Sequence, residues 1–164
     1  MSNGFPKAEF RNTPAAVVVP FYLYAAAGFL VCTILLLLSA GSFTLHFFNP
    51  AVLAITHVMA LGWGTMIILG ASYQLLPVLT ERSLWSFKLA QWSFVLAAVG
   101  IPLLVYGFYT FNMGWPAKWG GRLVLISVLL YLINIVKSSR TGKKINVHAC
   151  FMATAAGWLF ITAF

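Results

Sequence analysis

A single histidine stands inside the most apolar part of the chain, and it is the side chain best suited to chemistry. His57 lies in residues 49–78, "NPAVLAITHVMALGWGTMIILGASYQLLPV". A neutral imidazole in hydrocarbon costs free energy unless it has a partner, so a histidine at membrane depth faces protein, water or a bound group. The residue type alone leaves two uses open: a metal or heme ligand, or a hydrogen bond to a neighbouring helix.

The composition places this histidine in a membrane protein. Of 164 residues, 62% are hydrophobic and only 7% are charged, whereas a soluble domain has about a quarter of its residues charged. A lipid bilayer is therefore the expected partner of most of the surface. The formal charge of +8 does not indicate nucleic acid, because the basic residues are scattered among apolar runs and form no continuous stripe.

The apolar runs predict the elements that position His57. A helix needs about 20 apolar residues to cross the hydrocarbon core. The first run is longer than the apolar region of a cleaved signal peptide, so we interpret it as a retained span. Asn49 and Pro50 suit the start of the second helix, as cap and first residue. The predicted fold is an all-α polytopic transmembrane bundle of about five spans, at residues 15–40, 50–79, 89–111, 121–136 and 147–164.

The basic residues predict the orientation of this bundle. Cytoplasmic connectors are rich in Lys and Arg, and an N-terminus inside places eight basic residues there: Lys7, Arg11, Arg82, Lys88, Lys137, Arg140, Lys143 and Lys144. Only Lys118 and Arg122 then lie outside. We predict a bacterial inner (cytoplasmic) membrane protein.

The domain organisation follows from the same runs. Residues 1–14 form a cytoplasmic tail, and residues 15–164 form a single transmembrane domain. The last run is still apolar at Phe164, so we expect the domain to be truncated at its C-terminal end.

Small residues share the predicted helix face of His57. At 3.6 residues per turn, Ala54, Ala60 and Gly64 lie on that face. They would allow a flat partner, either a helix or a macrocycle, to approach the imidazole. At 1.5 Å per residue from Pro50, His57 lies about 10 Å along the helix, in the outer half of the bilayer.

The sequence around His57 resembles that of a known protein family. The stretch "THVMALGWGTMIILGASYQLLPV" resembles the second transmembrane helix of the heme-copper oxidase subunit I superfamily, including cytochrome c oxidase subunit I and the nitric oxide reductase branch. There, a helix entering from outside carries a histidine, a Gly/Trp stretch and then Gly-Ala-x-Tyr-x-x-x-Pro. The matching residues here are His57, Gly62, Trp63, Gly70, Ala71, Tyr73 and Pro77. The resemblance implies that His57 is an axial ligand to the iron of a low-spin b- or a-type heme, with Ala54, Ala60 and Gly64 beside it.

The resemblance also implies a role. The chain would be the N-terminal portion of a respiratory oxidase subunit I-like oxidoreductase, contributing a heme for electron transport beside the remaining helices of a longer chain or other subunits. The other histidine ligands of the family belong to later helices, so no catalytic residue is assigned and copper is not supported by the residues present.

Two alternatives stay open. One is a small polytopic scaffold or assembly subunit without cofactor, in which His57 bonds to a neighbouring helix. The other is a heme- or copper-related stress protein of the same ancestry without turnover.

The two remaining histidines do not complete a site with His57. His46 lies in the predicted outer loop, and His148 lies at the inner end of the fifth run. His148 and His57 should differ in depth by roughly 20 Å in a 30 Å core, whereas metal–imidazole bonds are about 2 Å long. We therefore predict no intramolecular bis-histidine site.

Overall fold

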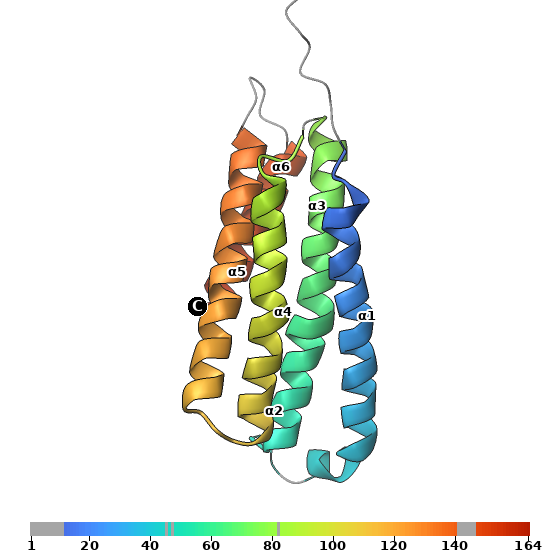
Figure 1. The fold of residues 1–164 in the computed structure, drawn as a ribbon, viewed down its shortest axis with the longest axis vertical. Helices are drawn as coiled ribbons and strands as arrows, with labels where there is room; N and C mark the ends of the chain where they lie inside the picture. The colour runs from blue at the N-terminus through green and yellow to red at the C-terminus, as the bar shows by residue number, and fades with distance from the viewer. Residues whose placement is uncertain (1–11, 45, 47, 82, 141–146) are drawn as a thin grey trace, which may run out of the picture.

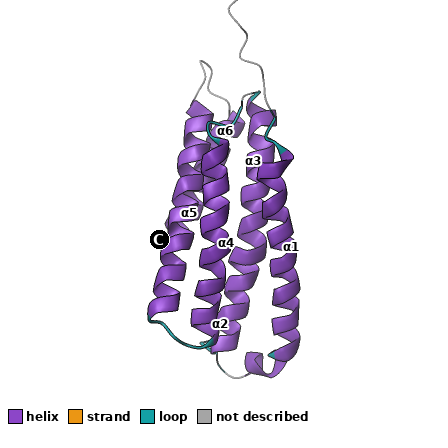
Figure 2. Ribbon diagram, in the orientation of Figure 1, coloured by secondary structure: helices purple, strands orange, loops and turns teal. Residues whose placement is uncertain are grey.

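A computed structural model describes residues 12–44, 46, 48–81, 83–140 and 147–164. These residues form helices joined by short loops, and the described part contains no strand (Figure 2). The helices lie side by side along one axis (Figure 1). In chain order they are α1 (Ala15–Leu38), the 3₁₀ helix η1 (Ala40–Thr44), α2 (Pro50–His57), the π-helix η2 (Val58–Thr65), α3 (Met66–Thr80), α4 (Phe87–Tyr109), α5 (Trp115–Arg140) and α6 (Val147–Ala163).

Four helical segments are long and apolar enough to cross a membrane. They are α1 with 24 residues, the continuous Pro50–Thr80 segment with 31, α4 with 23 and α5 with 26. At 1.5 Å per residue, even α4 reaches about 35 Å, more than the hydrocarbon core of about 30 Å. The apolar α6 is shorter, with 17 residues. The all-α membrane bundle is thus confirmed, and the chain is an integral multi-pass membrane protein.

Local sequence signals set several helix ends. The Asn49 side chain accepts a hydrogen bond from the Ala51 amide at 2.9 Å, and Pro50 is the first helical residue, which confirms the predicted start of the second span. The Ser86 hydroxyl caps α4 by accepting from the Leu89 amide at 3.2 Å. These caps satisfy amides that a helix start leaves without partners.

The two ends of the bundle differ in the basic residues they carry. The start of α4 and the end of α5 lie at the upper end in Figure 1, and the opposite ends of both helices lie below. Lys88, Lys137 and Arg140 therefore belong to the upper end, and Lys118 and Arg122 to the lower. The other basic residues of the orientation argument lie outside the described residues (Lys7, Arg11, Arg82, Lys143 and Lys144), as does most of the predicted tail, residues 1–14. The N-inside orientation stays a prediction.

Glycines bring α4 and α5 into close contact. A Cβ added to Gly120 would lie 2.4 Å from the Leu104 amide nitrogen, and one added to Gly107 would lie 2.8 Å from that of Ala117. Gly100 is equally confined, with Gly120 O at 3.0 Å. Small residues are what allow membrane helices to approach this closely, because dispersion contacts between the backbones then hold them together.

The span Pro50–Thr80 packs against α1 in a similar way. A Cβ on Gly28 would lie 2.8 Å from the backbone of Gly62, and one on Gly70 would lie 2.9 Å from Phe21 Cβ. Phe21 is fully buried, and its ring centroid is 5.6 Å from that of Tyr73. The core therefore runs along α3, between α1 on one side and the α4–α5 pair on the other.

Candidate functional site

His57 is held by its own helix and by an aromatic ring from α4. It is the last residue of α2 and is half-buried. Its Nδ1 lies 2.7 Å from Leu53 O. The carbonyl can only accept, so Nδ1 carries the hydrogen and donates it. The imidazole also packs against Phe108, with ring centroids 4.2 Å apart and an angle of 42°. The hydrogen-bond partner is thus a carbonyl of the same helix, whereas the scaffold alternative expected one on a neighbouring helix.

A π-helix begins directly after this histidine. In η2 the hydrogen bonds run from residue i to i+5, a rare geometry that is frequent at functional sites. Thr65 Oγ1 also reaches back five residues to donate to Ala60 O at 2.9 Å. The Trp63 ring lies 5.5 Å from that of Phe29 on α1. This wider turn is therefore anchored to α1 by an aromatic pair as well as by the Gly62–Gly28 contact.

The small residues predicted beside His57 lie in three different environments. Ala54 is fully buried, Ala60 is exposed and Gly64 is half-buried. The prediction used 3.6 residues per turn, and this spacing does not hold across η2, which takes more residues per turn. Their place beside a heme stays a prediction, as does the heme itself.

The other two histidines lie outside the helix that carries His57. His46 is exposed, and its Nδ1 accepts from the Phe48 amide at 3.1 Å. His148 is exposed at the start of α6, at the opposite end of the bundle from α2 (Figure 1). Within the described residues, no three His, Cys, Asp or Glu side chains come close enough together to hold a metal ion.

The buried polar side chains are used to join α4 to α5. Ser127 Oγ donates to Ser93 O at 2.6 Å, and Ser93 Oγ lies 3.1 Å from Ser127 O. Asn134 makes two bonds to the residue that caps α4: Nδ2 donates to Ser86 O at 2.9 Å, and Oδ1 accepts from the Ser86 amide at 3.2 Å. Ser138 Oγ accepts from the Trp85 amide at 2.9 Å. Sequence reasoning missed this set, because single serines in apolar runs do not indicate which helix they face.

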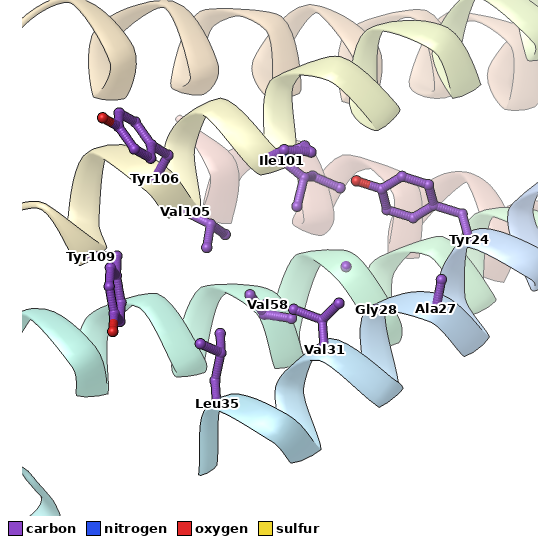
Figure 3. Close-up of a pocket in the computed structure, with 12 residues that line it drawn as sticks. Tyr24, Ala27, Gly28, Val31, Leu35, Val58, Ile101, Val105, Tyr106 and Tyr109 are labelled. Atoms are coloured by element: carbon purple, nitrogen blue, oxygen red, sulfur yellow. The ribbon is translucent and has the colours of Figure 1, made fainter. Parts of the chain in front are cut away.

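A cavity of about 430 Å³ lies beside η2, between α1 and α4. Figure 3 shows Tyr24 toward one end of it and Tyr109 toward the other, with Val31, Val58 and Ile101 between them. Its walls are almost entirely apolar. Nothing in the sequence pattern indicates this cavity, because it arises from the way three separate helices pack.

Comparison with known proteins finds a relative that is itself a membrane protein. The chain is 36% identical over 86 residues to the UPF0674 endoplasmic reticulum membrane protein YNR021W of Saccharomyces cerevisiae. The match covers 51% of this chain and 21% of the yeast protein, so the chain spans about a fifth of the length of the curated relative it matches. No family model matches the chain. No solved structure matches it either.

These findings correct the family that the sequence was predicted to belong to. The similarity found is to a membrane protein of another description, and no family model supports the heme-copper oxidase subunit I superfamily. The expectation of a respiratory oxidase segment that serves electron transport is therefore wrong as well. The physical reason lies in the residues that carried the resemblance, because most of them have packing uses: Gly62 contacts Gly28, Gly70 contacts Phe21, and Tyr73 fills the core.

Proposed function

We propose that this chain is a polytopic membrane scaffold or assembly subunit without cofactor. The observation that supports it most is the set of interior polar side chains that join α4 to α5 by hydrogen bonds. Such bonds between neighbouring helices stabilise a membrane bundle. His57 adds a ring contact with Phe108 of α4, while its Nδ1–H donates to Leu53 O of its own helix.

The interior and the outer surface of the bundle use different kinds of side chain. The paired serines Ser93 and Ser127 and the buried Asn134 bond one helix to another. The outer surface, in contrast, is apolar and available to lipid or to other membrane proteins. Large exposed side chains occur on several helices, among them Leu23 (66%) and Trp158 (64%). A rigid bundle with such a surface suits a subunit that positions other membrane proteins.

The bacterial cytoplasmic membrane is our proposed location, and the endoplasmic reticulum named for the yeast relative is the alternative. Both membranes favour basic residues on the cytoplasmic side, so the charge distribution is compatible with either. In fractions of the native cell, the chain should accompany a marker of the bacterial cytoplasmic membrane, and its recovery with an endoplasmic reticulum marker would overturn the proposed location.

The scaffold role is tested by capturing neighbours in the native membrane. A photo-crosslinking amino acid at Trp158, on the exposed face of α6, should join the chain to one discrete membrane protein. The same group at Asn112, in the exposed loop between α4 and α5, serves as the control. If Trp158 gives only uncrosslinked chain at native expression levels, or crosslinks no more specifically than Asn112, the scaffold proposal is wrong.

The absence of a cofactor is tested separately by absorption spectroscopy. The purified full chain, expressed with an ample heme supply, should show no Soret band. A stoichiometric Soret band that disappears in His57→Ala would overturn this part of the proposal.

A further inference from the structure

The cavity between α1 and α4 has the shape of a slot parallel to the helices. On α1 its walls extend from Tyr24 to Leu35, eleven residues or about 16 Å at 1.5 Å per residue. On α4 the slot ends at Tyr109. At the other end, the Tyr24 hydroxyl donates to Ala98 O at 3.2 Å and ties α1 to α4. The slot is therefore closed at one end by a hydrogen bond between its two walls.

The length of the slot matches the thickness of one leaflet of the hydrocarbon core. A length of about 16 Å is half of the hydrocarbon core of about 30 Å. Tyr24 is the tenth residue of the 24-residue α1, near its middle, and Tyr109 is the last residue of α4. The slot thus extends from the middle of the bundle to its lower end in Figure 1, and it lies along the direction of the lipid chains.

The walls offer apolar contacts and an opening toward the bilayer. Val58 and Ile101 form the buried floor, with 5% and 4% exposed. Val31 is 46% exposed on the α1 side, and Tyr106 and Tyr109 are 59% and 51% exposed near the end of α4. Tyrosines are enriched where the hydrocarbon core meets the headgroups. Tyr106 and Tyr109 therefore lie where the headgroup end of a bound lipid is expected.

We propose that this slot binds one acyl chain of a membrane phospholipid from the leaflet at the α4 C-terminal end. An empty space of this size would deprive its lining of dispersion contacts, and a flexible apolar chain can fill it. Bilayer phospholipid is present in large excess, so mass action favours occupancy even where the preference for the slot is weak. This lipid site does not depend on the scaffold role proposed above.

The proposal is tested on the full chain incorporated into vesicles of phosphatidylcholine that carries a diazirine in the middle of one acyl chain. After extraction and extensive washing in mild detergent, native mass spectrometry should find one retained lipid. Irradiation should then place the label on the slot residues Val31, Val58 or Ile101, and not on the lipid-facing Leu23.

A matched pair of variants separates the slot from the general lipid-facing surface. Val31→Trp puts a bulky ring into the slot and should abolish retention of the lipid, while Leu30→Trp, at the 61% exposed neighbouring position, should retain it. Ala27→Leu, a smaller filling change on the same wall, provides a second variant if Val31→Trp does not fold. The proposal is overturned if Val31→Trp or Ala27→Leu retains the lipid as the native chain does. It is also overturned if the label falls equally on Leu23.

Discussion

The α4–α5 interface and the α1–α4 slot lie in the same hydrocarbon yet pack very differently. Along α4–α5, glycines allow backbones to touch, and the Ser93–Ser127 pair adds hydrogen bonds. Between α1 and the lower half of α4, valine, isoleucine and tyrosine side chains leave a cavity of about 430 Å³. Lipid is as apolar as these side chains, so burying them gains little. In this protein, helices come into close contact where small and polar residues lie, and the hydrophobicity of a helix face does not predict these contacts.

The largest expected effect comes from adding one methyl group to the α4–α5 interface. Gly120→Ala places a Cβ where the Leu104 backbone stands, 2.4 Å from its nitrogen. Overpacking against backbone should destabilise the bundle by about 3 kcal/mol, the upper end of the usual range. Equilibrium unfolding in mixed micelles measures this change.

Gly121→Ala is the matched control for that substitution. No atom lies within 4 Å of a Cβ added at Gly121, so only the higher helix propensity of alanine acts there, and the free energy of unfolding should rise by up to about 1 kcal/mol. A loss from Gly121→Ala equal to that from Gly120→Ala would show that the close approach of α4 and α5 does not determine the cost of the added methyl group.

The next effect concerns the hydrogen bonds at the start of α4. Asn134→Ala removes both contacts with Ser86 and leaves the amide and carbonyl of the half-buried Ser86 without these partners. We expect a loss of about 1–2 kcal/mol in the same unfolding measurement, near the upper limit for hydrogen bonds inside membrane proteins. Gln91→Ala removes an exposed amide from α4 and should change little. An Asn134→Ala chain as stable as Gln91→Ala would contradict the assigned role.

His57→Ala tests a contact whose expected contribution to stability lies between those of the α4–α5 interface and of the α1–α4 slot. It removes the hydrogen bond to Leu53 O and the stacking on Phe108, and should cost about 1 kcal/mol. His57→Phe retains a ring against Phe108 and should recover part of the loss. If both variants lose the same stability, the stacking contributes nothing measurable.

The smallest effect is expected at the wall of the slot. Val31→Ala removes two methyl groups that already border the cavity and are 46% exposed, so the free energy of unfolding should change by less than about 0.5 kcal/mol. Phe21→Ala on the same helix, at a fully buried position, should cost far more. A large loss from Val31→Ala would show that α1 and α4 are packed as tightly there as α4 and α5.

The sequence predicts the helices well because their boundaries depend on local signals. The lengths of apolar runs locate four long helices and one short one, and Asn49 with Pro50 marks the start of the second span. Which faces meet depends on pairs of residues far apart in the chain. Gly28 and Gly62 form a close contact with one glycine from each helix, so no spacing within a single helix indicates it.

The candidate site is harder to predict than the helices, for two physical reasons. An imidazole that donates Nδ1–H to a carbonyl can also ligate a metal through Nε2, so neither the residue type nor this hydrogen bond separates the two uses. The small residues around His57 were assigned to one face by α-helical spacing, whereas the chain forms a π-helix from Val58 to Thr65. Polar residues such as Ser93 and Asn134, which join helices, carry no comparable signal in a single sequence.

The π-helix also determines where this span could lose a residue. Its i→i+5 hydrogen bonds hold one residue more than regular α-helix, so deleting one residue between Val58 and Thr65 would allow α-helix to run through with the later residues still on their present faces. The same deletion early in α3, which is regular α-helix, would instead turn the later residues by about 100°, so that Tyr73 would leave the core and the exposed Gln74 would take its place. A single-residue deletion should therefore be tolerated within η2 and rejected early in α3, even though every residue type in both segments is acceptable to the bilayer.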